Sequence, residues 1–367
     1  MVQISKWKVI LVLAICGLGI LLASPNLVAP EKVGSIPSWL PNKQMSLGLD
    51  LRGGAHLLIE AKVDEALKEG LQSLQQGVRR ALRRSPSIGY RSLGLIRNGI
   101  SVTVRDEKDR EEARQRLREI GDQMVLERDE NRFTLKFTED QLRDRRSNIL
   151  EQAITILRLR IDPDSVKETS IQRQGTDRIL LQVPGADPER LKRLIGQTAK
   201  MSFHLVDPEI STLDPRRRVR PGTMVLKSRD EADGSGQPLY YLVKKRIEVS
   251  GENLVDSQAT VEQGRPVVSF RFDPVGARRF GNTTRRNVDK PFAIVLDKEV
   301  ISAPVIREPI LGGNGIISGN FTTEGARDLA LLLRSGALPV PLTIIEERSV
   351  GPSLGADSIA AGKTASI

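Results

Sequence analysis

The most distinct hydrophobic pattern in the chain is an uncharged run near its N-terminus, residues 9–29. The first part of this run, residues 9–23, contains only apolar residues and glycine, and Lys6 and Lys8 precede it. A helix of about 21 residues is about 30 Å long, which matches the hydrocarbon core of a membrane. A signal peptide is the alternative, since its hydrophobic region has a similar length, but no cleavage site of the A-x-A type follows. The pattern therefore predicts a transmembrane anchor within residues 1–30, with the N-terminus in the cytoplasm and the bulk of the chain outside.

Strands and helices are interleaved in residues 47–207, after a linker at 31–46 that contains several Pro and Gly residues. Alternating apolar positions predict strands, and apolar positions three and four apart predict helices. The predicted strands are 55–61, 101–104, 132–137, 178–183 and 201–205, and the predicted helices are 64–84, 109–120, 138–157 and 187–195. Thr138 and Gln141 have the spacing of a capping box at the start of the longest helix. This order predicts an α+β domain with helices on one face of a sheet, which we call the base.

A second domain is predicted after a turn-rich, polar linker at 208–238. Strands are expected at 267–272, 292–296 and 300–303, and helices at 274–287 and 323–334. This α+β module, the head, covers 239–340, and a returning strand follows at 341–352. Residues 353–367 are mostly small, with several apolar residues, and are either a frayed tail or the start of a second membrane helix. If both ends lie at the membrane, the head is an insertion carried outward by the base.

Composition excludes several classes of function. The chain has one Cys and two His, too few for an internal disulfide or a zinc site with four Cys and His ligands. Its 8 Phe, 3 Tyr and 2 Trp are few for a protein that stacks nucleic-acid bases. No Ser, His and Asp set for nucleophilic catalysis is evident. We therefore predict no catalytic residues, no cofactor, no metal and no nucleic-acid partner. A protein that is not an enzyme is the favoured interpretation, and a membrane-bound hydrolase is the third-ranked alternative because carboxylates are plentiful.

The formal net charge of +10 suggests an anionic partner. Basic runs lie at 79–84 and 216–220. Each could contact phosphate, although the first alternates with apolar residues as a solvated helix face does, and the second lies in the predicted linker. Membrane lipid explains these charges more simply than nucleic acid does.

Two segments are candidate functional motifs. The first contains Gly48, Asp50, Arg52, Gly53 and Gly54. Asp50 and Arg52 share one face of a strand, and the two adjacent glycines permit close backbone approach. A structural turn that closes the base sheet is the favoured interpretation on residue chemistry alone.

The second candidate segment combines the apolar strand 300–306 with a glycine-rich tip at 311–315. Such a segment could add a strand to an extended peptide, or it could be ordinary core and turn. The candidate contact residues for such a peptide are Ile301, Val305, Ile306, Gly312 and Gly313.

Several stretches resemble the SecD/SecF family of the bacterial Sec protein-export machinery. The most specific are LGLDLRGGAHLLIEA at 47–61 and GPSLGADSI at 351–359, and longer similar stretches cover 170–207 and 266–322. The resemblance implies a first transmembrane helix, a ferredoxin-like periplasmic base, an inserted head and the start of a second transmembrane helix. It also marks Gly351, Pro352, Gly355 and Asp357 as motif residues where that second helix begins. The segment 160–169 departs from the family because it lacks the usual Gly and Glu-Pro.

The resemblance also implies a function. The family assists late translocation of unfolded preproteins across the bacterial inner membrane, coupled to the proton gradient, and the head is expected to bind the emerging chain. The implied partners are SecF, the SecYEG channel, YajC, SecA, unfolded preprotein and membrane lipid. The family's proton-carrying residues lie in later helices, and the sequence ends before them, as a truncated chain would. The alternative is a periplasmic scaffold or peptide-binding module, anchored in the membrane without motor activity.

Overall fold

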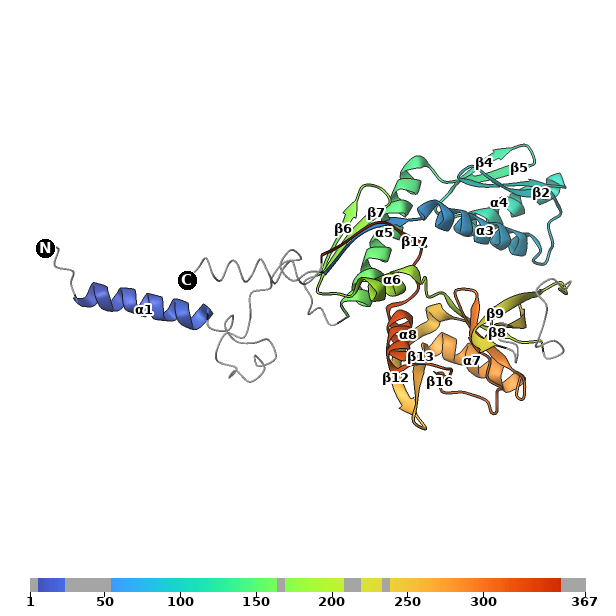
Figure 1. Ribbon diagram of the computed structural model, residues 1–367. Coiled ribbons are helices and arrows are strands. Elements are labelled where there is room, and N and C mark those ends of the chain that lie inside the picture. The colour runs from blue at the N-terminus through green and yellow to red at the C-terminus, as the bar shows by residue number, and fades with distance from the viewer. Residues whose placement is uncertain (1–5, 24–53, 164–168, 208–218, 233–237, 351–367) are drawn as a thin grey trace. The chain divides into compact units, whose positions relative to one another are not determined.

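The computed structural model describes residues 6–23, 54–163, 169–207, 219–232 and 238–350 (Figure 1). The chain divides into two compact units, one of residues 1–53 with 350–367 and one of residues 54–349. In the first unit, helix α1 covers Lys6–Ala23, and its residues 7–19 are exposed. Among the described residues, no helix is both long enough and apolar enough to cross a membrane. The predicted anchor is therefore not confirmed, and the expected second span from 353 lies outside the described residues.

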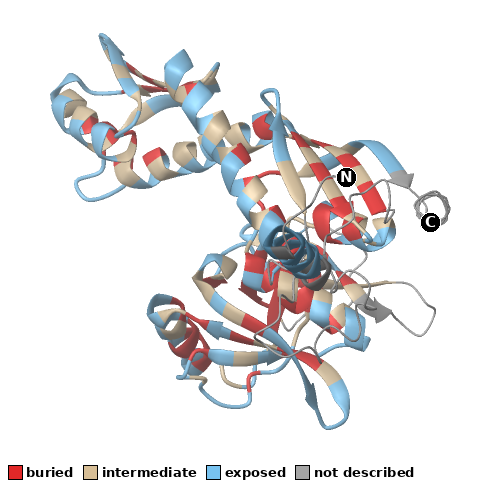
Figure 2. Cartoon of the chain, turned by 90° about the vertical axis from the view of Figure 1, so that its left-hand side faces the viewer, coloured by how far each residue is buried: buried red, intermediate tan, exposed pale blue. Residues whose placement is uncertain are grey.

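The base is built on a four-stranded sheet with the order β17-β1-β7-β6. These strands are β1 (Gly54–Ala61), β6 (Ser170–Gln174), β7 (Arg178–Pro184) and β17 (Leu342–Val350), and the helices are α5 (Glu139–Ile161) and α6 (Pro188–Gly196). The succession β1, α5, β6, β7, α6, β17 is the β-α-β-β-α-β order of the ferredoxin-like motif. Buried and half-buried residues alternate along β1 and β7, as expected for strands with one face on a core (Figure 2).

The predicted capping box at the start of α5 is confirmed. The Thr138 hydroxyl accepts a hydrogen bond from the Gln141 backbone N–H at 3.2 Å, and the Gln141 side chain accepts one from the Thr138 N–H at 2.9 Å. Two backbone donors that the helix cannot satisfy itself are thereby paired, which sets where α5 begins.

Residues 63–137 form a module of their own between β1 and α5, whereas the sequence analysis assigned them to a single base. Its sheet has the order β2-β3-β5-β4 and shares no strand with the base sheet. The elements are α3 (Val63–Leu82), β2 (Tyr90–Ile96), β3 (Gly99–Val104), η3 (Glu107–Asp109), α4 (Arg110–Ile120), β4 (Val125–Asp129) and β5 (Arg132–Lys136). Helices α3 and α4 lie on one face of this sheet and enclose a separate core with it (Figure 1). We call this part the inserted module.

The head lies between α6 and β17 and contains two sheets, with the orders β10-β9-β15-β14-β8-β11 and β12-β13-β16. Five phenylalanines fill its main core, with neighbouring ring centroids 5.2 to 6.1 Å apart. The strands of the six-stranded sheet are β8 (Met201–Leu205), β9 (Thr223–Ala232), β10 (Pro238–Lys244), β11 (Val249–Ser250), β14 (Phe292–Leu296) and β15 (Glu299–Ser302). The other elements are η4 (Gly251–Asn253), β12 (Leu254–Glu262), β13 (Arg265–Phe272), α7 (Pro274–Arg286), β16 (Asn314–Ile317) and α8 (Thr323–Ser335).

The division of the chain differs from the prediction at two strands. β8, which falls within the predicted base, pairs with β14 and β11 and so belongs to the head. β9 falls within the predicted 208–238 linker but pairs with β10 and β15. The alternation of apolar residues identifies a strand, but it does not identify the sheet that the strand joins.

Candidate functional site

A groove of about 270 Å³ opens on the head, next to the segment that the sequence analysis singled out. Its floor consists of aromatic rings from the core, and its walls come from the loop after β15 and from β16. The lining residues are Phe203, Phe270, Phe280, Thr284, Phe292, Ile294, Pro304, Val305, Ile306, Arg307, Glu308, Ile310, Gly315 and Ile316. An apolar groove with few polar groups suits apolar side chains of a ligand rather than a chemical reaction.

The candidate contact residues divide between the core and the surface. Ile301 is 2% exposed and Ile306 is 5% exposed, so both side chains serve the core. Ile301 is therefore not available to a peptide in this structure, and Ile306 contributes only to the groove lining. Val305 is 53% exposed on the groove wall and is directly accessible.

Glycines shape the groove through close contacts. A Cβ atom on Gly315 would lie 2.3 Å from the end of the Phe270 ring, so the ring packs directly on the strand backbone. Gly313 has a φ of +69°, and a Cβ there would lie 2.4 Å from the Ala277 side chain in α7. A Cβ on Gly312 would instead make only an ordinary contact, 3.9 Å from the side-chain nitrogen of Asn314. The glycine-rich tip is thus closely packed at Gly313 and Gly315, which the sequence pattern alone does not indicate.

The strand beside the groove has an unpaired edge. β16 is the last strand of its sheet, and in the described part of the chain it pairs with β13 alone. Ile316 in β16 is 44% exposed and lines the groove. An unpaired edge next to an apolar groove is the arrangement that binds an extended peptide by strand addition.

The polar groups of the groove are either satisfied or at its rim. The Thr284 hydroxyl accepts a hydrogen bond from the Ile310 N–H at 3.0 Å and donates one to the Gly281 carbonyl at 3.2 Å. Arg307 and Glu308 are exposed. Within the described ranges, no three His, Cys, Asp or Glu side chains gather as a metal site requires.

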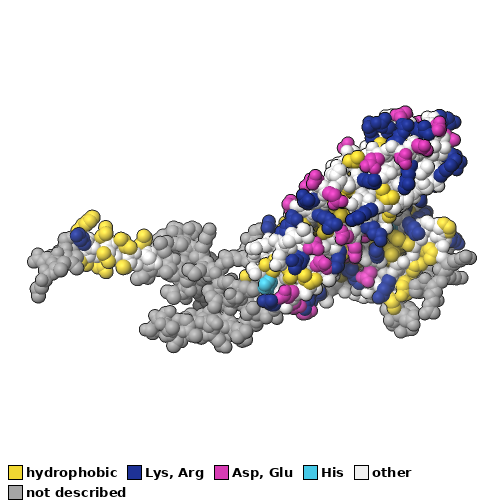
Figure 3. Space-filling view, turned by 90° about the horizontal axis from the view of Figure 1, so that it is seen from above, with side chains coloured by type: hydrophobic (Ala, Val, Ile, Leu, Met, Phe, Trp, Pro, Cys, Tyr) yellow, Lys and Arg dark blue, Asp and Glu magenta, His cyan; other side chains and the backbone are white. Residues whose placement is uncertain are grey.

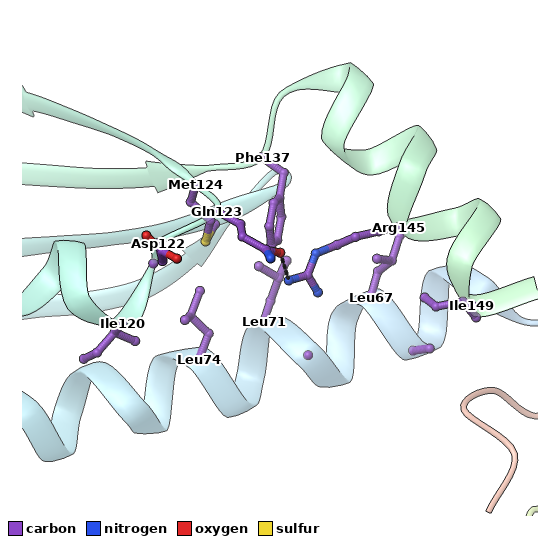
Figure 4. Close-up of a pocket in the computed structure, with 13 residues that line it drawn as sticks. Leu67, Leu71, Leu74, Ile120, Asp122, Gln123, Met124, Phe137, Arg145 and Ile149 are labelled. Atoms are coloured by element: carbon purple, nitrogen blue, oxygen red, sulfur yellow. Dashed lines mark hydrogen bonds between the residues drawn. The ribbon is translucent and has the colours of Figure 1, made fainter. Parts of the chain in front are cut away.

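A second cavity, of about 280 Å³, lies between α3, α5 and the loop that leads into β4 (Figure 4). Leu67, Leu71 and Leu74 of α3 form one wall of it. The Arg145 guanidinium lies 4.5 Å from the centre of the Phe137 ring and donates a long hydrogen bond, 3.5 Å, to Gln123. The cavity therefore lies where the inserted module meets the long helix of the base.

Arg160, in the last turn of α5, connects the base to the head. Its side chain is 1% exposed, and its guanidinium donates to the carbonyls of Leu194 at 2.9 Å and Thr198 at 3.1 Å, and also to that of Gln197. It also donates to the Gly336 carbonyl at 3.0 Å and the Ser335 hydroxyl at 3.3 Å. These acceptors lie at the ends of α6 and α8 and in the segment that enters the head. One cation thus satisfies the C-terminal ends of two helices.

Charged groups around Arg160 complete this junction. Burial lowers the pKa of Arg160 to about 10, against the opposing attraction of Asp297. Asp297 accepts hydrogen bonds from the Ala199 N–H at 2.9 Å and the Lys200 N–H at 2.8 Å. The sequence analysis noted 160–169 only as a departure from a family pattern. A single basic residue at a helix end gives no signal of burial, so the role of Arg160 was missed.

Polar contacts also join α6 to α8 outside this cluster. Arg190 forms an ion pair with Asp328 at 2.9 Å, and Arg193 forms one with Glu324 at 3.5 Å. The apolar residues of α6 are divided, with Leu194 in the head core and its neighbours Leu191 and Ile195 in the base core. The junction between base and head therefore includes ion pairs between α6 and α8 as well as the hydrogen bonds of Arg160.

Comparison with known proteins places the chain in a family. A model of the SecD/SecF GG motif matches residues 38–65, the N-terminal part of the SecDF P1 domain matches 150–208, and the SecDF P1 head subdomain matches 223–340. Protein translocase subunit SecD of Rickettsia prowazekii is 40% identical over 370 residues, which cover 100% of this chain and 70% of that protein. The chain belongs to the SecD family of protein translocase subunits.

Other relatives agree with this assignment. SecD of Acetobacter pasteurianus is 40% identical over 98% of this chain and 68% of its own length. The crystal structure of SecDF in its super-membrane-facing form matches 95% of this chain with a TM-score of 0.50 and 28% identity, but only 37% of that chain is covered. The α+β fold therefore resembles SecDF, and the SecD relatives support a role in protein export, a transport function.

The GG-motif match includes the whole of β1 and ends in the first turn of α3. Gly54 begins β1, is buried, and pairs with Pro184 of β7. Its φ of +138° is one that other residues rarely adopt. Gly48, Asp50, Arg52 and Gly53 lie outside the described residues, as do Gly351, Pro352, Gly355 and Asp357.

Proposed function

We propose that the head holds an extended segment of an unfolded preprotein while that preprotein crosses the bacterial inner membrane. The groove beside the free edge of β16 carries this proposal. Backbone groups of β16 would bind the backbone of the client, which is the same in every sequence. The aromatic floor would take apolar side chains of many shapes.

The physical chemistry of this groove favours a weak grip. Burying one apolar side chain contributes about 1.5–3 kcal/mol. Ordering the client backbone and side chains opposes this gain. The balance suits a client that must bind and leave repeatedly as it moves.

The wider setting is also part of the proposal. The chain would be anchored by its N-terminal segment, with the N-terminus in the cytoplasm and residues 54–349 in the periplasm. It would act late in translocation with SecF and the SecYEG channel, together with YajC and SecA, and would be coupled to the proton gradient. The GG-motif residues and the motif at Gly351, Pro352, Gly355 and Asp357 would lie at the membrane. The SecD names of its relatives support this setting.

Site-specific photocrosslinking tests the groove. A photoreactive residue is placed at Val305 or Ile316, and a radiolabelled preprotein is arrested during translocation in membrane vesicles. The matched control position is Val261, a valine that is 68% exposed on the other edge strand of the same sheet, β12, and does not line the groove. We expect crosslinks from positions 305 and 316 to the unfolded preprotein, and few from position 261.

Two results would contradict the proposal. Equal crosslinking from all three positions would indicate nonspecific proximity, and crosslinking only to folded proteins would exclude an unfolded client. A second measurement uses Val305→Asp and Val261→Asp, which each add one carboxylate to an exposed position. Only the first substitution is expected to slow export of a reporter preprotein.

A further inference from the structure

The inserted module contains a stretch with one sign of charge. Residues 79–105 include seven arginines and no Asp, Glu or Lys. All seven side chains are exposed. Their positions are Arg79, Arg80, Arg83, Arg84, Arg91, Arg97 and Arg105. This stretch lies between the family matches at 38–65 and 150–208, so those matches assign it no role.

Five of these arginines gather at one end of the module. Arg79 and Arg80 are exposed in the last turn of α3, whereas Val78 and Leu82 are buried, and Arg83, the C-cap residue, and Arg84 follow directly. The loop after α3 folds back, because the Ile88 N–H donates to the Leu82 carbonyl at 2.8 Å. The Arg105 N–H donates to the Gly89 carbonyl, also at 2.8 Å, which brings the end of β3 beside this loop. We call Arg79, Arg80, Arg83, Arg84 and Arg105 the arginine face.

The arginine face differs from three arginines of the neighbouring helix α4 in how its charges are balanced. Three arginines in α4 each pair with a carboxylate: Arg110 with Glu107, Arg114 with Glu111, and Arg116 with Glu112. Lys and Arg side chains are also dense in the upper right of Figure 3, where the module lies, but with Asp and Glu among them. Among the described residues, no member of the arginine face forms an ion pair. The nearest acidic residue in sequence, Asp106, follows Arg105 without pairing to it.

Helix stability does not explain five unpaired arginines. A cation near the C-terminus of a helix is favourable, but the effect is confined to the last turn and needs only one or two charges. Like charges this close repel one another and destabilise the helix. The repulsion between these arginines is relieved when an external anion supplies the negative charge that balances them.

We propose that the arginine face binds the anionic phosphate headgroups of a phospholipid membrane. Arginine is the residue best suited to phosphate, because its planar guanidinium donates two parallel hydrogen bonds. The one aromatic residue in 79–105, Tyr90, is half-buried, so the face lacks the stacking surface that single-stranded nucleic acid requires. None of the five lines a described cavity that would hold a peptide. This inference rests on the membrane attachment given under the proposed function.

Energy transfer to labelled lipid tests the proposal on the full chain. Cys16→Ser removes the single native thiol, and Ser87→Cys places a fluorophore on the exposed loop after α3. The chain is reconstituted into vesicles of phosphatidylcholine, with or without phosphatidylglycerol, that carry an acceptor dye on their headgroups. Each arginine near an anionic surface strengthens binding about fivefold. We expect transfer to rise with phosphatidylglycerol and to fall at high salt.

Two quadruple variants separate the arginine face from total charge. R79Q/R80Q/R83Q/R84Q should lose the dependence on phosphatidylglycerol. R278Q/R279Q/R285Q/R286Q removes the same amount of positive charge from exposed positions of α7. Energy transfer in this variant should still depend on phosphatidylglycerol. Circular dichroism checks that both variants remain folded. Equal transfer in the two lipids, or equal loss in the two variants, would overturn the proposal.

Vesicle flotation distinguishes this inference from the proposed function. A chain that does not float with phosphatidylcholine vesicles lacks the membrane attachment. The arginine face is then judged by flotation with phosphatidylglycerol vesicles, which should still depend on Arg79, Arg80, Arg83 and Arg84. A chain that floats in both lipids but shows no lipid-dependent transfer refutes the arginine face alone.

Discussion

Replacing Arg160 by Met should destabilise the junction between base and head more than any conservative surface change. The substitution keeps an unbranched apolar stem and removes every donor of the guanidinium. The carbonyls of Leu194, Gln197, Thr198 and Gly336 then lose a partner in the interior, while the Ser335 hydroxyl still donates to the Leu332 carbonyl.

The size of the effect follows from these lost contacts. The Thr198 carbonyl keeps the Leu338 N–H as a donor, so three carbonyls, those of Leu194, Gln197 and Gly336, lose the donor described for them. A buried acceptor left without a donor costs about 1–3 kcal/mol, so three of them set a range of about 3–9 kcal/mol. Two terms reduce that figure, because water reaches some helix ends and because burying the cation is itself unfavourable, as the lowered pKa of Arg160 shows. We expect a loss of about 3–5 kcal/mol in the free energy of unfolding, a large part of the stability of a typical domain.

Urea unfolding of Arg160→Met and of the matched variant Arg158→Met measures this loss. Arg158 is exposed on the same helix, and its substitution should change stability by less than about 0.5 kcal/mol. Hydrogen exchange adds a local measurement at Leu338, whose N–H donates to the Thr198 carbonyl at 2.8 Å. Its exchange should accelerate in the Met variant. Arg160→Lys should be intermediate, because one ammonium group cannot reach all the acceptors.

A different outcome would refute this reasoning. If Arg160→Met unfolds at the same urea concentration as Arg158→Met, the cost of burying the cation cancels its hydrogen bonds. Arg160 would then serve specificity of packing rather than stability. If stability falls but exchange at Leu338 is unchanged, the arginine does not hold the two connecting segments together.

Three further results are expected. Gly313→Ala should cost about 1–3 kcal/mol in urea unfolding, because a side chain there is strained at positive φ and has no space, whereas Gly312→Ala should be nearly neutral. Burial lowers the pKa of His204 below its usual 6.5 in the folded chain. As the pH falls below 6.5, His204 is therefore protonated more readily in the unfolded chain than in the folded chain, and the free energy of unfolding should decrease. In His204→Gln, the slope of stability against pH in that range should flatten. A double-mutant cycle on Arg190 and Asp328 should give a coupling below about 1 kcal/mol, since Arg190 is substantially exposed.

Much of the secondary structure and one helix cap were predictable from the sequence. The alternation of Met201, Phe203 and Leu205 identified a strand, and Thr138 with Gln141 located the start of α5. Such signals depend on residues within a few positions of one another, so the sequence carries them directly. The resemblance to the family extended this reading to the ferredoxin-like order of the base.

Only the tertiary structure decided how these elements combine. It separated residues 63–137 as a module with its own sheet and core, and it moved β8 into the head. It also buried Ile301 and left Val305 on the groove wall, although both belong to one apolar segment. The bonds of Arg160 join residues 34 to 176 positions apart. Periodicity and capping are local, whereas sheet partners, grooves and buried charges depend on contacts between distant segments, which only the folded chain brings together.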